Sequence, residues 1–254
     1  MDVIFLGLDG VLFDTEALHL AACNAAFANA GLSVRWTART LRSAVASHGY
    51  AGAVSAALPQ ALARQRRQMA ALSAMAADKH QQFHQAIADA PPAALPAALA
   101  LIDDAVADGC KICILTDLPA PATSQLLSHA FGADVNSLFT VVTGGASFDG
   151  PAGTGPYARA LHAMGVQAAD AIVIDGDVPA LRAAAAAGLW TVSVSPYGAE
   201  VVRPRQFITY DALRDLHSSP YTPDQRHDGA AATAIAATVS AAVAANATRR
   251  KLAA

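Results

Sequence analysis

Polar residues that can do chemistry follow several short apolar runs of the sequence. Five of them follow three separate runs: Asp9, Thr116, Asp117, Asp175 and Asp177. Carboxylates can bind a divalent cation, and a hydroxyl group beside them can bind a phosphate group. A single Asp after a strand is often only a helix cap or a turn residue, so the inference depends on the whole set and its order along the chain.

The runs that precede these residues are typical of buried strands in a parallel sheet. Each is short and nearly continuous in apolar or β-branched residues: Val3–Leu8, Lys111–Leu115, Ala171–Ile174 and Trp190–Val194. Helical stretches with a glycine stop lie between them: Pro96–Ala107, Tyr157–Met164 and Ala180–Ala187. This alternation predicts an α/β fold with a doubly wound parallel sheet. Ligands bind at the carboxyl ends of such strands, so the polar residues should meet at one edge.

Residues 16–90 break the alternation because they contain no good strand. Their helical patterns are Ala17–Ala30, Ala38–Ala46, Tyr50–Ala57, Leu62–Ala76 and Asp78–Asp89. Pro91, Pro92 and Pro96 mark the return to the sheet. We therefore expect residues 1–15 and 91–217 to form the α/β core, and residues 16–90 to form an inserted helical cap over the site.

The most specific pattern lies in the first run and its loop. Residues 5–16 read F-L-G-L-D-G-V-L-F-D-T-E. This resembles the first motif of the haloacid dehalogenase (HAD) superfamily, usually written F-D-L-D-G-T-L-x-D-T-E. Similarity extends over residues 1 to about 195, including the cap opening at 19–27 and the stretch 181–188. The chain resembles phosphosugar phosphatases and phosphoglucomutases, and is most similar to CbbY-type proteins, which implies a Rossmannoid core, a helical cap, hydrolase chemistry and magnesium.

The resemblance implies catalytic roles for Asp9, as general acid/base, and for Thr116, which would hold the phosphate. The family's nucleophilic Asp falls at Gly7, and its Lys falls at or near Pro151. Glycine cannot form an aspartyl-phosphate. Without the Lys, a cation that balances the phosphate charge is missing.

Metal ligands are implied at Asp9, Asp175 and Asp177. Two alignments of the last motif stay open. One places Asp175 at the family's Glu and Gly176 at its metal-binding Asp, and the other, shifted by one residue, makes Asp175 the ligand. In both, the carboxylate missing at position 7 weakens magnesium binding.

Substrate contacts are implied at Gly10, His19, Lys79, Thr116 and Asp117. His19 and Lys79 belong to the predicted cap. On residue type alone, His19 also reads as a surface histidine of a helix, and Lys79 as a solvated charge. The segment His48–Ala51 replaces a loop that carries a basic substrate contact in relatives.

The sequence therefore predicts a HAD-like protein that lacks or nearly lacks phosphatase turnover and binds a small phosphorylated metabolite. One alternative is an active magnesium-dependent phosphatase or hydrolase with altered chemistry that uses Asp9 and Asp175. Another is a regulatory or structural partner protein that makes contact through its C-terminal tail.

Length, charge and composition limit the partners and the location that we expect for this protein. The chain has 254 residues and a net charge of -3 at pH 7, which argues against a nucleic-acid-binding surface. No signal peptide or convincing membrane span is present, so we expect a cytoplasmic protein without a membrane partner. The Ala-rich residues 218–254 are expected to form a weakly docked or disordered tail. Cys110 and Cys113 form a C-x-x-C that we interpret as core packing.

Overall fold

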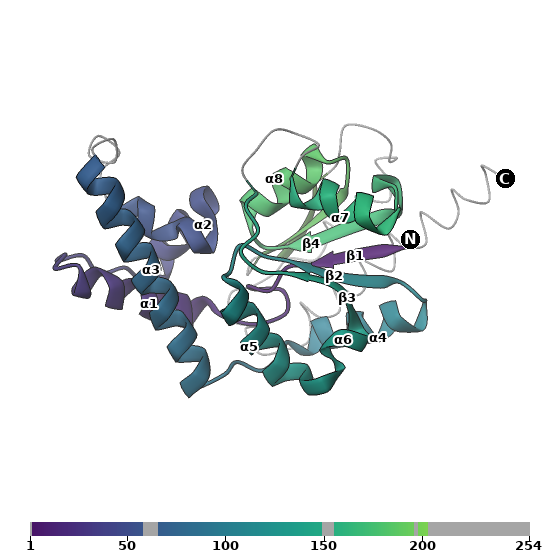
Figure 1. The fold of residues 1–254 in the computed structure, drawn as a ribbon, viewed down its shortest axis with the longest axis horizontal. Coiled ribbons are helices and arrows are strands. Elements are labelled where there is room, and N and C mark those ends of the chain that lie inside the picture. The colour runs from purple at the N-terminus through teal and green to yellow at the C-terminus, as the bar shows by residue number, and fades with distance from the viewer. Residues whose placement is uncertain (1, 58–65, 149–154, 196–197, 203–254) are drawn as a thin grey trace.

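The computed structural model describes residues 2–57, 66–148, 155–195 and 198–202 (Figure 1). Within them, one six-stranded sheet has the order β3-β2-β1-β4-β5-β6. The strands are β1 (Val3–Leu6), β2 (Lys111–Leu115), β3 (Phe139–Thr143), β4 (Ala171–Asp175), β5 (Trp190–Ser195) and β6 (Gly198–Val202). The first five are parallel, and β6 runs antiparallel to β5.

Helices cover both faces of the sheet, which confirms the doubly wound α/β fold. On one face lie α4 (Pro96–Ala107), α5 (Ala120–Phe131) and the short α6 (Val135–Leu138). On the other lie α7 (Pro156–Met164) and α8 (Val178–Ala186). Short 3-10 turns occupy Gly132–Asp134 and Ala168–Asp170.

The inserted segment forms a helical layer beside the carboxyl ends of the strands (Figure 1). It consists of α1 (Glu16–Asn29), α2 (Ala38–Gly52), a 3-10 turn (Ala53–Ala57) and α3 (Arg66–Asp89). It has an apolar cluster of its own, in which the rings of Phe27 and Trp36 pack edge to face with their centres 4.8 Å apart. The chain leaves the sheet and returns to it at neighbouring points, because Phe13 bridges to Ala94.

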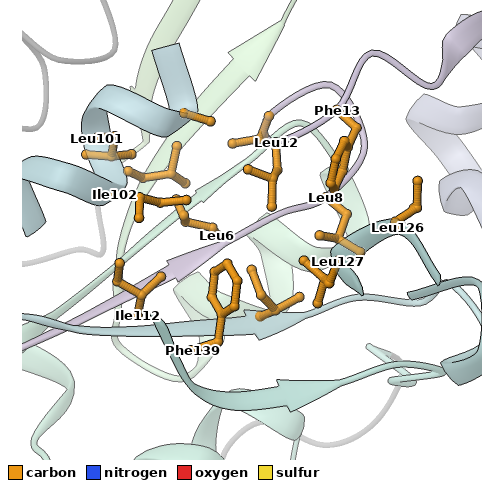
Figure 2. Packing of buried hydrophobic residues seen from close by; sticks show 14 of the residues in the cluster. Leu6, Leu8, Leu12, Phe13, Leu101, Ile102, Ile112, Leu126, Leu127 and Phe139 are labelled. Atoms are coloured by element: carbon orange, nitrogen blue, oxygen red, sulfur yellow. The ribbon is translucent and has the colours of Figure 1, made fainter. Parts of the chain in front are cut away.

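The loop after β1 is anchored by its own apolar side chains (Figure 2). Leu8, Leu12 and Phe13 are at most 1% exposed and belong to the cluster that contains Leu101 and Ile112. Burial of three large side chains within six residues fixes the path of this loop. Asp9 therefore has a defined position between them.

Several sequence predictions need correction. The strand β3 and the helix α5 were not expected. The predicted break between helices near residue 77 does not exist, because α3 is continuous from Arg66 to Asp89. The predicted helices at 38–46 and 50–57 are one helix, interrupted at Gly49, followed by a 3-10 turn.

The remaining predictions concern the cysteines, the tail and membrane spans. Cys113 is buried with its Sγ 3.6 Å from the Met164 Sδ, and Cys110 is partly buried against the core, as expected of packing residues. The predicted tail lies outside the described residues. None of the helices in the described part of the chain is both long and apolar enough to cross a membrane.

Candidate active site at the carboxyl edge of the sheet

The five polar residues singled out in the sequence lie around one small pocket at the ends of β1, β2 and β4. Among the residues that the structure describes, nine line it: Leu8, Asp9, Tyr50, Thr116, Asp117, Phe148, Asp175, Asp177 and Ala180. Four of the nine are aspartates and none is basic. The cavity measures about 10 Å³, which is room for about one water molecule.

Asp9 is held by two hydrogen bonds to the same oxygen. Its Oδ1 accepts from the Thr15 hydroxyl at 2.5 Å and from His19 Nε2 at 2.9 Å. Burial raises the pKa of Asp9, but His19, Thr15 and Lys79 outweigh burial, and the net pKa lies below its usual value. Asp9 is therefore an ionised carboxylate.

His19 is fully buried, so the interpretation as a surface histidine is wrong. Its ring stacks between the rings of Phe83 and Tyr50, with ring centres 4.0 Å and 4.3 Å away, respectively. Burial and then Lys79 lower the pKa of His19 to about 4, although Asp9 opposes them. The ring is therefore neutral at pH 7, and we assign its proton to Nε2, which donates to Asp9. The buried Nδ1 has no hydrogen-bond partner among the described residues.

Lys79 is also fully buried, so the interpretation as a solvated charge is wrong. Its Nζ donates to the Tyr50 carbonyl at 2.9 Å and lies 5.5 Å from the centre of the Phe83 ring. Burial lowers the pKa of Lys79 below its usual value, although Cys23, Asp9 and Asp117 oppose this effect. Neither Lys79 nor His19 lines the pocket. Both support Tyr50, which does.

Gly7 lies directly after β1, beside Asp175 at the end of β4. The register pairs Leu6 with Ile174, and the Gly7 N–H donates to the Ile174 carbonyl at 2.8 Å. A Cβ atom at Gly7 would lie 2.5 Å from Asp175 Oδ1, 2.6 Å from its Cγ and 2.9 Å from its Oδ2. The Asp175 carboxyl group therefore fills the space that a side chain at position 7 would need. Its Oδ1 accepts from the Asp177 N–H at 2.9 Å.

Asp175 and Asp177 both line the pocket, whereas position 176 does not. A Cβ atom at Gly176 would lie 2.9 Å from the Val194 carbonyl oxygen and 3.4 Å from that of Asp9. An Asp at position 176 would thus meet backbone atoms. Of the two alignments left open by the sequence, this placement supports the one in which Asp175 supplies the carboxylate.

Thr116 and Asp117 follow β2. Thr116 is buried, and its Oγ1 accepts from the Leu118 N–H at 3.2 Å, so its hydroxyl hydrogen can still be donated to a ligand. Asp117 Oδ2 accepts from the Ala51 N–H of the cap at 3.0 Å. Gly10, the remaining predicted contact, is exposed in a turn with φ 71° and does not line the pocket.

Three of the four aspartates that line the pocket have raised pKa values. Burial, with Asp9 next, raises the pKa of Asp117 to about 6. Burial, with Asp117 next, raises that of Asp177 to about 7. Burial and Asp177 raise the pKa of Asp175 well above its usual value. Like charges that share a small site resist simultaneous ionisation.

Magnesium suits the donor atoms of this pocket but not their arrangement. Carboxylate oxygens are the ligands that magnesium prefers, and Asp177 Oδ1 is buried and has no hydrogen-bond partner in the described part of the chain. Across the described ranges, however, no three acidic, His or Cys side chains are placed to hold a metal ion. The predicted set of Asp9, Asp175 and Asp177 is close together without converging on one point, so the residues as placed do not fit the ion.

Four of the lining residues were not predicted from the sequence to belong to the site: Leu8, Tyr50, Phe148 and Ala180. Only the segment that contains Tyr50 was singled out, as a replacement for a substrate-contacting loop of relatives. Pro151, at the family's Lys position, lies outside the described residues.

Comparison with known proteins settles the family. The family model described as haloacid dehalogenase-like hydrolase matches residues 1–188. The chain belongs to this hydrolase family. Among curated proteins, it is 30% identical over 198 residues to the plasmid-borne protein CbbY of Cupriavidus necator, covering 76% of this chain and 77% of that protein. It is 27% identical over 202 residues to protein CbbY of Rhodobacter capsulatus, covering 76% and 84%.

Solved structures of HAD-like proteins have the same fold as this chain. CbbY from Rhodobacter sphaeroides in complex with phosphate has a TM-score of 0.62 and 24% identity, covering 75% of this chain and 84% of that one. A predicted phosphoglycolate phosphatase from Haemophilus somnus 129pt has a TM-score of 0.58 and 16% identity, with 76% and 84% covered. The HAD-like α/β fold and the likeness to CbbY-type proteins, both expected from the sequence, are confirmed.

Proposed function

We propose that this chain binds a small phosphorylated metabolite at the carboxyl edge of the sheet and has little or no phosphatase turnover. The observation that carries the second part is the Gly7–Asp175 arrangement. Gly7 has no side chain to attack phosphorus, and the Asp175 carboxyl group occupies the room that such a side chain would need. A covalent aspartyl-phosphate at position 7 is therefore excluded by chemistry, because glycine has no carboxylate.

Support for ligand binding comes from the parts of the site that remain. Thr116 lines the pocket and its hydroxyl can donate one hydrogen bond, and the ionised carboxylate of Asp9 is held in place at the same pocket. CbbY-type relatives include a protein that was solved with phosphate. The family resemblance therefore supports a phosphorylated compound as the ligand class.

The negative charge of the pocket works against both phosphate binding and turnover. Four aspartates line the pocket and none of the nine described lining residues is basic, so these residues repel a phosphate dianion. Positioning and charge stabilisation supply most of the catalysis in phosphoryl transfer. A site without a nucleophile, and with this charge, is poorly suited to turnover even where the ligand is held.

The test combines thermal unfolding with an activity assay in the presence of magnesium over a panel of sugar monophosphates and bisphosphates. At about 100 times its Kd, a true ligand should stabilise the protein by about 2.7 kcal/mol. The effect should persist in Thr116→Ser and disappear in Thr116→Val, which has a similar shape but no hydroxyl. Turnover should stay at least about 10⁴-fold below that of a working enzyme, as after nucleophile removal elsewhere.

An altered hydrolase remains the second candidate because Asp9 is ionised, fixed and faces the pocket. Such a carboxylate suits a base that activates water directly. Clear turnover that collapses in Asp9→Asn would favour this candidate and reject the first. A partner role of residues 218–254 concerns a part of the chain outside the described residues.

A further inference from the structure

We propose that Asp117 is a positioning residue that holds Gly49–Ala51, the kinked end of α2 that we call the cap loop, closed over the pocket, and that a ligand enters only when this contact opens. The proposal rests on the proposed function only for the identity of that ligand. It assigns to Asp117 a role between cap and core in place of the substrate contact expected from the sequence.

The contact involves both polar atoms of one peptide group. The Ala51 N–H donates to Asp117 Oδ2 at 3.0 Å, and the carbonyl of the same peptide group, that of Tyr50, accepts from Lys79 Nζ at 2.9 Å. Asp117 belongs to the core, directly after β2, whereas Lys79 belongs to α3 of the cap. The Tyr50–Ala51 peptide thus links a cap lysine to a core carboxylate, and a hydrogen bond to an ionised carboxylate is stronger than one between neutral groups.

Gly49 makes this close approach possible. It interrupts α2 with φ 68° and ψ 175°, a conformation that side chains with a Cβ rarely adopt. A Cβ atom there would lie 2.9 Å from Asp117 Oδ2 and 3.1 Å from Asp177 Oδ1. Only a glycine lets the cap backbone approach the two carboxylates so closely.

The loop also carries the residue that closes the pocket. Tyr50 lines the cavity, and its ring stacks on His19, which donates to Asp9. With the loop in this place the cavity holds about 10 Å³, far below the roughly 300 Å³ or more typical of ligand pockets. A sugar phosphate cannot enter without displacement of the loop, so the strength of the Asp117 contact sets the fraction of open molecules.

Amide hydrogen exchange of the full chain tests the proposal, with Asp117→Ala and Asp117→Asn as the decisive pair. Both variants remove the charge, but only the Asn side chain keeps an oxygen that can accept the Ala51 N–H. Exchange of the cap-loop amides should become about 10- to 100-fold faster in Asp117→Ala, and the acceleration in Asp117→Asn should be clearly smaller, because the neutral hydrogen bond is weaker than the charged one but is still made. Amides of β2 and β4 should not change in either variant. Asp14→Ala, an exposed acidic residue in the loop after β1, is the control.

Gly49→Ala provides an independent test because it disturbs the same contact from the cap side. It should also accelerate exchange in the cap loop. Equal exchange of these amides in wild type, Asp117→Ala and Gly49→Ala would overturn the proposal. So would acceleration in Asp117→Asn as large as in Asp117→Ala, since charge alone would then be responsible.

Binding of inorganic phosphate separates this proposal from the proposed function. If both hold, phosphate should bind Asp117→Ala more tightly than Asp117→Asn, by the factor measured in exchange. If the cap loop opens as expected but no variant binds phosphate or a sugar phosphate, the positioning role of Asp117 stands and the proposed ligand class is wrong.

Discussion

Substitution of Gly7 should be costly because of Asp175, and this dependence can be measured. In Gly7→Ala, the new methyl group would lie 2.5 to 2.9 Å from all three outer atoms of the Asp175 carboxyl group. If the carboxyl group rotates away, it gives up the hydrogen bond from the Asp177 N–H, worth about 1–3 kcal/mol. If it stays, overpacking costs about 1–3 kcal/mol. Either route predicts a loss of about 2 kcal/mol in the free energy of unfolding.

A double-mutant cycle isolates the contribution of Asp175. Urea unfolding of wild type, Gly7→Ala, Asp175→Ala and the double variant gives the coupling free energy directly. The Gly7→Ala change should cost under about 1 kcal/mol in the Asp175→Ala background, so the coupling should reach about 1–2 kcal/mol. Gly155→Ala is the matched control, because a Cβ atom at Gly155 meets nothing within 4 Å.

Equal costs of Gly7→Ala in the two backgrounds would refute the reasoning, since the Asp175 carboxyl group would then not be the obstacle. The same geometry bears on attempts to restore a nucleophile. Gly7→Asp alone adds a second carboxyl group to space that is already filled. It should destabilise the protein at least as much as Gly7→Ala and should not create phosphatase activity.

Three further predictions concern His19, Gly176 and magnesium. The pKa of His19 is about 4 in the folded state and 6.5 in the unfolded state, so the unfolded state binds more protons and stability falls as pH drops from 6.5 to 4. The wild-type advantage in unfolding free energy over His19→Gln should therefore shrink by about 3 kcal/mol between pH 7.5 and pH 4, and a constant difference would contradict the assignment. Gly176→Ala should cost about 1–3 kcal/mol because its Cβ would meet the Val194 carbonyl oxygen at 2.9 Å, and a loss as small as that of Gly155→Ala would argue against this contact. Magnesium at 1 mM should stabilise the protein by less than about 0.4 kcal/mol, the value for a Kd of 1 mM, and a larger shift in thermal unfolding would show that the carboxylates rearrange around the ion.

The fold was predictable from the sequence where strands are buried on both faces. The runs that become β1, β2, β4 and β5 are nearly continuous in apolar residues, and the structure places strands at each of them. The strand β3 lies at the edge of the sheet, and its residues alternate between buried and more exposed positions. A search for continuous apolar runs cannot detect such a strand. The position of the pocket followed from the rule that parallel strands meet at their carboxyl ends.

The finer geometry of the site could not be read from the sequence. The overlap of Asp175 with the space at Gly7 depends on the register of β1 against β4 and on the direction in which one carboxyl group rotates. Burial of His19 and Lys79 depends on how the cap packs against the core. Both residue types are more common at surfaces, so residue type alone favours the wrong interpretation.

Retention of Asp9, Thr15 and His19 is not by itself a sign of retained catalysis. Asp9 Oδ1 accepts hydrogen bonds from both other residues, all three are at least nine-tenths buried, and Lys79 adds a nearby charge. Removal of His19 or Thr15 would take one hydrogen bond from the buried Asp9 carboxylate, and a hydrogen bond to a charged group is worth about 1.5–3 kcal/mol. The network also joins the loop after β1 to α1 of the cap, so folding alone gives a reason to keep it. Gly7 and Gly176 have no side chain and therefore take no part in this hydrogen-bonded network. Asp9, Thr15 and His19 are therefore residues that stability also requires. Their presence is compatible with the proposed lack of turnover, in which the scaffold keeps its cap and its pocket without a nucleophile at position 7.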